Sequence, residues 1–113
     1  MRVGVVGLGS MGQNHVRILS EMGVLASVAD IVPDIAKAVA AKYSVESHLS
    51  YQDLLRSDID AVVIVTPTDT HEKIASDAIR AGKHVLLEKP MTGSSEKLRL
   101  LAALAGDKKV VLA

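Results

Sequence analysis

The stretch of sequence that decides the fold lies near the N-terminus and reads Val3-Gly4-Val5-Val6-Gly7-Leu8-Gly9-Ser10-Met11-Gly12. Its first four residues are small and apolar, which is typical of a strand that is buried on both faces. The residues from Ser10 onward have the apolar spacing of a helix. Three glycines in the pattern G-x-G-x-x-G connect the two, and the third, Gly12, falls in the first turn of the helix. The sequence therefore predicts a strand, a glycine-rich turn and a helix, in that order.

Each glycine of this motif has its own physical reason. Gly7 permits the tight turn out of the strand, Gly9 lets a pyrophosphate approach the backbone, and Gly12 lets the helix pack against the strand. The free N–H groups of a helix N-terminus favour an anion, so Ser10 and Met11 would complete a phosphate-binding loop. The alternative is a glycine-rich turn that serves packing alone. The position directly after a strand favours a dinucleotide.

Short apolar runs alternate with amphipathic stretches along the rest of the chain. The expected strands are Val3–Val6, Leu25–Ala29, Ala61–Val65, His84–Leu87, Lys109–Leu112 and a weaker one near Val45–His48. The expected helices are Ser10–Met22, Pro33–Lys42, Tyr51–Arg56, Thr70–Ala81 and Ser94–Ala105. Such alternation predicts βαβ units and a parallel sheet. The fold class is therefore α/β, a doubly wound Rossmann sheet with strand order 3-2-1-4-5-6.

Three local signals mark helix ends. Pro33 is expected to open its helix, because its fixed φ suits the first turn. Asp69 is followed three residues later by Glu72, a capping-box pattern at a helix start. Gly82 is expected just past the end of the same helix, where a left-handed residue is wanted.

Asp30 ends the second strand, at about the separation of 20 residues expected for a ribose-binding acid. A carboxylate there accepts hydrogen bonds from adenosine ribose hydroxyls and repels a 2′-phosphate. Neither Arg nor Lys occurs in Ile31-Val32-Pro33 to pair with such a phosphate. The cofactor expected is therefore NAD rather than NADP. The alternative, which does not exclude the first, is that Asp30 caps the helix begun by Pro33.

The composition favours one domain over residues 1–113 and excludes several classes of function. Hydrophobic residues make up 49% of the 113 and aromatic residues 2%, which suits a parallel sheet covered by helices. The net charge is zero, so no basic field attracts nucleic acid or an anionic membrane. The chain has no cysteine, which excludes disulfides and is compatible with the cytoplasm. Its scattered histidines predict no metal site.

The two ends of the sequence carry further expectations. No signal-peptide pattern follows Met1, and the apolar runs are too short to cross a bilayer, so a soluble protein is expected. The chain stops inside the apolar run Val110-Val111-Leu112-Ala113. We therefore expect a domain cut before a second, substrate-binding domain. An apolar edge strand left uncovered invites pairing, so we also expect a homo-oligomer.

A third group of polar residues follows two later strands at their carboxyl ends, where open α/β sheets bind ligands. Thr66-Pro67, with His71 beyond it, follows one strand, and Glu88-Lys89-Pro90 follows another. A lysine there can donate to a substrate oxygen, or accept a proton when desolvation favours its neutral form. The alternative is a solvated lysine in a turn.

Taken in order, these motifs resemble the glucose–fructose oxidoreductase / inositol dehydrogenase / rhizopine-catabolism (Gfo/Idh/MocA) family. They are G-x-G-x-x-G, Asp30, Thr66-Pro67 with His71, Ala81-Gly82-Lys83-His84-Val85 and Glu88-Lys89-Pro90, and they span nearly the whole chain. In that family the domain binds NAD or NADP, and a following α/β domain binds a sugar, a cyclitol or a related substrate. The lysine matching Lys89 is catalytic or lies beside the nicotinamide, and the proline matching Pro90 is often cis.

The resemblance implies a dehydrogenase that moves a hydride between nicotinamide and a secondary alcohol or ketone of a sugar, nucleotide sugar or cyclitol. It implies that Thr66, Pro67 and His71 border the nicotinamide half, with Glu88 and Lys89 at the reacting end. The family's further active-site residues, commonly an Asp and a His on one helix, belong to the second domain. The isolated domain is therefore expected to be inactive. The alternative is a non-catalytic NAD-binding sensing or regulatory module.

Overall fold

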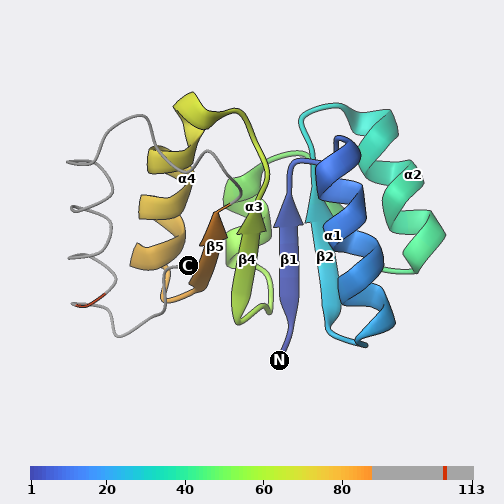
Figure 1. The fold of residues 1–113 in the computed structure, drawn as a ribbon, viewed down its shortest axis with the longest axis horizontal. Coiled ribbons are helices and arrows are strands. Elements are labelled where there is room, and N and C mark those ends of the chain that lie inside the picture. The colour runs from blue at the N-terminus through green and yellow to red at the C-terminus, as the bar shows by residue number, and fades with distance from the viewer. Residues whose placement is uncertain (88–105, 107–113) are drawn as a thin grey trace.

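The computed structural model describes residues 1–87 and Gly106 (Figure 1). Its elements in chain order are β1 (Val3–Val6), α1 (Ser10–Glu21), β2 (Leu25–Ala29), α2 (Pro33–Tyr43), β3 (Glu46–His48), α3 (Tyr51–Arg56), β4 (Ala61–Ile64), α4 (Thr68–Arg80) and β5 (His84–Leu87). All strand pairs are parallel, and the strands lie in the order β3-β2-β1-β4-β5.

This order confirms the expected doubly wound α/β fold over the part of the chain that is described. The strand order reverses between β1 and β4, because β1 pairs with β2 on one side and with β4 on the other. The expected sixth strand, Lys109–Leu112, and the expected helix Ser94–Ala105 lie outside the described residues. Glu88, Lys89 and Pro90 lie outside them as well.

Helices cover both faces of the sheet, so the core has two halves (Figure 1). The half under α1 and α2 is built from small aliphatic side chains, of which Val5, Val16, Val28 and Ala36 are fully buried. The half under α3 and α4 contains the fully buried Leu54, Ile64, Ala75, Ala78 and Ile79. Burial on both faces explains why the central strands β1 and β4 are continuous apolar runs rather than alternating ones.

Two of the three helix-end signals expected from the sequence are confirmed, and one is wrong. Pro33 is the first residue of α2, and Gly82, at φ +79°, follows the C-cap of α4, as expected. The capping box expected at Asp69 is wrong, because α4 begins at Thr68 with Pro67 as its N-cap. Pro67 has φ −55° and ψ 147°, a polyproline II conformation, and the Thr70 N–H donates to its carbonyl at 2.9 Å. The first turn therefore closes before Asp69 could act as a cap.

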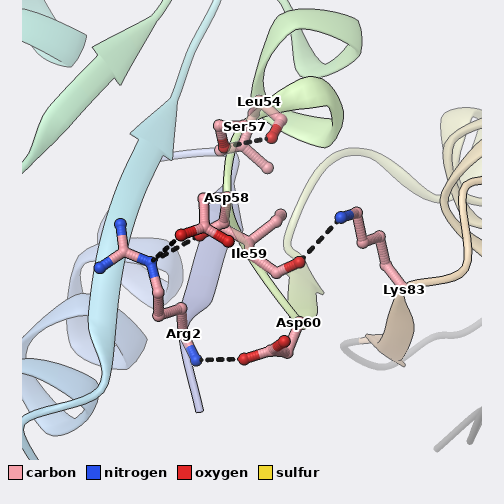
Figure 2. A network of polar contacts seen from close by, with 7 residues as sticks. All are labelled: Arg2, Leu54, Ser57, Asp58, Ile59, Asp60 and Lys83. Carbon is pink, nitrogen blue, oxygen red and sulfur yellow. Dashed lines mark hydrogen bonds and ion pairs between the residues drawn. The ribbon is translucent and has the colours of Figure 1, made fainter.

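A polar network closes the amino-terminal edge of the sheet (Figure 2). The Arg2 backbone N–H donates to Asp60 Oδ2 at 2.8 Å, and Arg2 Nε donates to the Asp58 carbonyl at 2.6 Å. Lys83 Nζ donates to the Ile59 carbonyl at 2.8 Å. Lys83 thus joins the start of β5 to the loop before β4, at the edge opposite to the carboxyl ends of the strands. No helix among residues 1–87 is long and apolar enough to cross a membrane.

Candidate cofactor-binding site

A cleft of about 720 Å³ opens at the carboxyl ends of the strands, where the strand order reverses. Its walls come from the glycine-rich turn after β1, the loops after β2, β3 and β4, the start of α3 and the first two turns of α4. Ligands of doubly wound sheets bind at this position, and the volume is within the range of small-molecule sites. The cleft is therefore the candidate functional site.

Two glycines of the motif are required by close packing of the backbone. Gly7 has φ +96°, and a Cβ built on it would lie 2.6 Å from the Val65 carbonyl oxygen. A Cβ on Gly12 would lie 1.8 Å from the Gly7 carbonyl oxygen. No side chain fits at either position. The turn after β1 is thus pressed against both the loop after β4 and the first turn of α1.

Gly9 has the opposite environment. It lines the cleft, and apart from Gly9 itself and its two chain neighbours no atom of the described residues lies within 4 Å of the position its Cβ would take. It is also the N-cap of α1, where no side chain accepts a hydrogen bond from the first turn. Ser10 and Met11 in that turn are exposed. The arrangement leaves free N–H groups beside an open space that a side chain would fill, which fits the close approach of a phosphate group.

Asp30 borders the cleft directly after β2, and both of its carboxylate oxygens accept backbone hydrogen bonds. Oδ2 accepts from the Leu8 N–H and Oδ1 from the Val32 N–H, each at 2.9 Å. The N-cap of α2 is Val32, so Asp30 forms a turn just before the helix instead of capping it. Each carboxylate oxygen has a second lone pair, which leaves acceptor capacity for ligand hydroxyls.

The wall beyond Asp30 is apolar. Ile31 is 88% exposed, Val32 and Leu49 are also exposed, and all three line the cleft. Buried Ile74 adds to the lining from α4. Large exposed aliphatic side chains around a cavity are a surface suited to a flat, apolar ring. Only the placement of Ile31 and Val32 next to Asp30 was visible in the sequence.

Tyr51 and Lys73 also line the cleft, and no motif in the sequence pointed to either residue. Tyr51 Oη donates to Asp77 Oδ2 at 2.6 Å. Burial, followed by this hydrogen bond, raises the pKa of Tyr51 to about 12. Lys73 Nζ lies 3.8 Å from the same Asp77 Oδ2. Asp77 therefore holds a neutral phenol and a cation on one side of the cleft.

The loop after β4 forms the floor. Thr66 and Pro67 line the cleft, and Thr70 Oγ1 lies 2.6 Å from both Thr66 Oγ1 and the Pro67 carbonyl oxygen. His71 is not on the wall. It is 2% exposed and lies beneath the loop, with Nε2 2.7 Å from the Thr66 carbonyl oxygen.

The cleft thus brings together five of the residues singled out from the sequence: Gly7, Gly9, Asp30, Thr66 and Pro67. Ser10, Met11 and Gly12 lie beside it in the first turn of α1. His71 lies under its floor, and Glu88 and Lys89 are outside the described residues. Within residues 1–87, no group of three or more His, Asp or Glu side chains is placed to hold a metal ion.

A parallel doubly wound sheet with a glycine-rich turn after β1 and an acid after β2 defines the Rossmann class of nucleotide-binding domains. The family model described as "Oxidoreductase family, NAD-binding Rossmann fold" matches residues 1–113. The chain belongs to this family, Gfo/Idh/MocA, as the motifs of the sequence indicated.

Two relatives show the range of the family. The chain is 40% identical over 113 residues to UDP-N-acetylglucosamine 3-dehydrogenase of Acidithiobacillus ferrooxidans, covering 100% of this chain and 36% of the relative. It is 37% identical over 114 residues to inositol 2-dehydrogenase of Rhizobium meliloti, covering 99% and 34%. The chain therefore spans about a third of the length of the curated relatives it matches.

Solved structures agree with the fold and differ in cofactor. GenD2 from gentamicin A biosynthesis, in complex with NAD, has a TM-score of 0.95 and 35% identity, covering 100% of this chain and 33% of that one. KijD10, a 3-ketoreductase from Actinomadura kijaniata in complex with NADP, has a TM-score of 0.93 and 31% identity, covering 99% and 36%. The likeness therefore does not decide between NAD and NADP.

Proposed function

We propose that this chain binds NAD(H) and forms the cofactor half of a dehydrogenase that acts on a sugar, nucleotide sugar or cyclitol. The observation that carries the proposal is the placement of Gly9 and Asp30 on one cleft at the reversal of strand order. A phosphate and a ribose are adjacent groups of a dinucleotide. The two residues suited to them lie on the same cleft.

Each part of the cleft suits one part of the cofactor. The open space at Gly9 and the N–H groups of the first turn of α1 would take the pyrophosphate. The remaining lone pairs of Asp30 would accept from the adenosine ribose hydroxyls. The apolar side chains of Ile31, Val32 and Leu49 would contact the adenine ring. The pyrophosphate then leads toward Thr66 and Pro67, which border the nicotinamide half in this proposal.

The preference for NAD over NADP rests on charge. The 2′-phosphate of NADP would lie beside the Asp30 carboxylate, and two neighbouring negative charges repel each other. Lys73 is a cation on the same cleft, but its side chain is 76% exposed and has Asp77 as an ion-pair partner. An exposed, paired lysine offsets little of the repulsion.

The reacting end is assigned by sequence position. Glu88 directly follows β5, and Lys89 is the next residue. β5 pairs in parallel with β4, whose own carboxyl end leads to Thr66. Bound nicotinamide supplies the hydride chemistry. Lys89 would donate to the substrate oxygen or accept its proton, and His71 would act beneath the floor rather than on the substrate.

The matched relatives are about three times as long as this chain, which supports a second domain that holds the substrate. We propose that residues 1–113 form one cofactor domain that binds the dinucleotide and catalyses no oxidation by itself. Positioning a substrate contributes roughly 7–11 kcal/mol to lowering a barrier, and this chain alone would lack it. Homo-oligomerisation and a cytoplasmic location belong to the same proposal.

An NMR titration maps the proposed site. Addition of NADH to the ¹⁵N-labelled chain is expected to shift the backbone amides of Leu8, Gly9 and Ile31. The amides of Arg2 and Lys83 at the opposite edge provide the internal control and are expected to stay in place. Shifts confined to the amino-terminal edge, or no shifts at millimolar NADH, would contradict the proposal.

A further inference from the structure

His71 is buried almost completely without lining the cleft. It is 2% exposed, and the other buried polar residue in the described part of the chain is Ser27. Burying an imidazole costs free energy unless its polar atoms are paired. The Nε2 atom lies 2.7 Å from the Thr66 carbonyl oxygen. A carbonyl only accepts, so Nε2 carries the proton and donates.

The Thr66 carbonyl belongs to the segment that joins the two halves of the site. On one side, the Val65 N–H donates to the Val6 carbonyl at 2.8 Å. The Val65–Thr66 peptide also lies against Gly7, whose Cβ would be 2.6 Å from the Val65 oxygen and 3.2 Å from the Thr66 nitrogen. A displacement of this peptide would therefore push directly on the glycine-rich turn.

On the other side, the same segment forms the floor of the cleft. Thr66 and Pro67 line it, and Thr70 Oγ1 contacts both of them at 2.6 Å. A hydroxyl has one proton, so Thr70 can donate in only one of these contacts. The bond from His71 is a second, independent restraint, and it acts from inside the core.

We propose that His71 is a positioning residue for the cofactor. Its Nε2–H holds the Thr66 carbonyl, which fixes the floor of the cleft against the glycine-rich turn, and its side chain does not touch the ligand. This inference rests on the proposed binding of NAD(H). It assigns a role in cofactor binding to His71, which does not line the cleft.

Three variants separate positioning from stability. His71→Leu removes the donor and leaves a buried carbonyl without its partner. His71→Gln keeps an N–H donor near the place of Nε2. Ile79→Val trims a buried side chain in the C-terminal half of α4 and serves as the control for general destabilisation. If His71→Leu does not fold, His71→Asn replaces it, because its shorter amide does not reach the Thr66 carbonyl.

Calorimetric titration with NADH is performed on each variant at a temperature where circular dichroism shows it to be folded. We expect His71→Leu to raise the dissociation constant at least about tenfold, because a floor that is no longer held in place must be ordered when the cofactor binds. His71→Gln and Ile79→Val are expected to stay within about threefold of wild type. In parallel, the imidazole ¹⁵N shifts of wild type, assigned by comparison with His71→Gln, are expected to show Nε2 protonated.

Several results would overturn the inference. Wild-type affinity in His71→Leu, with NADH bound by the wild-type chain, removes the role of His71 and leaves the proposed function standing. A neutral ring protonated on Nδ1 instead of Nε2 removes it as well. Failure of the wild-type chain to bind NADH overturns both the inference and the proposed function.

Discussion

The Asp30 carboxylate and the Leu8 backbone N–H are joined by a hydrogen bond of 2.9 Å across 22 residues of sequence. The other oxygen of the same carboxylate accepts from the Val32 N–H at 2.9 Å. The acid proposed to bind ribose therefore also connects the glycine-rich turn to the loop after β2. Asp30 therefore holds two loops of the cleft in place in the absence of a ligand. Because these loops are already ordered, binding loses less conformational entropy.

Gly9 and Gly12 are expected to respond differently to a side chain. Gly9→Val places its side chain in open space, so stability should change by no more than about 1 kcal/mol, the cost of a poor N-cap. The same side chain takes the space proposed for the pyrophosphate, and NADH affinity should fall at least about tenfold. Gly12→Ala forces a carbon against the Gly7 carbonyl and should cost about 3 kcal/mol of stability or more.

Urea unfolding and NADH titration of the two variants test this contrast. A Gly9→Val variant that binds NADH as well as wild type would show that the phosphate lies elsewhere.

The raised pKa of Tyr51 predicts that the folded chain loses stability at alkaline pH. Its pKa is raised from 10.0 to about 12 in the folded chain, chiefly by burial and then by the hydrogen bond to Asp77. The unfolded chain loses the phenol proton first, so the contribution of this group is complete below pH 10.0 and falls as the pH rises toward about 12. Melting temperatures of wild type and Tyr51→Phe should therefore converge over that range. A constant difference across it would contradict the assignment.

Lys83 is expected to matter for stability and not for the cofactor. Lys83→Met keeps most of the aliphatic stem and removes the 2.8 Å hydrogen bond to the Ile59 carbonyl, which should cost about 1–2 kcal/mol. NADH affinity should remain within about twofold of wild type, because the residue lies at the opposite edge of the sheet. If the folded Lys83→Met variant binds NADH much more weakly than wild type, Lys83 belongs to the binding site and the prediction is wrong.

The sequence predicted the fold well because the deciding features are local. Local backbone conformation is determined within a few residues of the glycine-rich turn, Pro33 and Gly82. The central strands β1 and β4 are continuous apolar runs, which the sequence shows directly. It predicted less of the cleft. Tyr51 and Lys73 lie on α3 and α4, and only the order of the strands brings them to the edge where Asp30 lies.

The sequence also did not predict which polar side chains are buried. The resemblance to the family implied that His71 borders the nicotinamide half of the cleft. In the structure it lies in the first turn of α4 and is buried, with Nε2 2.7 Å from the Thr66 carbonyl oxygen. Lys83 belongs to a stretch that indicates the family, and its contact is structural.

Lys89 is predicted to act in catalysis in a protein that contains both domains. Lys89→Ala should lower turnover at least about a hundredfold, the scale of lost general acid–base help. NADH affinity should change much less, because the cleft around Gly9 and Asp30 is untouched. Steady-state kinetics and NADH titration of the same variant check the two parts. Near-normal turnover would make Lys89 a turn residue.

The central claim is that this cleft binds NAD(H) through Asp30, and one calorimetric experiment tests it most directly. Wild type, Asp30→Ala and Asp34→Ala are each titrated with NADH and with NADPH. Asp34→Ala removes the same charge from the exposed first turn of α2 and is the matched control. We predict that wild type and Asp34→Ala bind NADH at least about tenfold more tightly than NADPH, and that Asp30→Ala loses NADH affinity and most of this preference. Equal or tighter binding of NADPH by wild type, or unchanged NADH affinity in Asp30→Ala, would contradict the account.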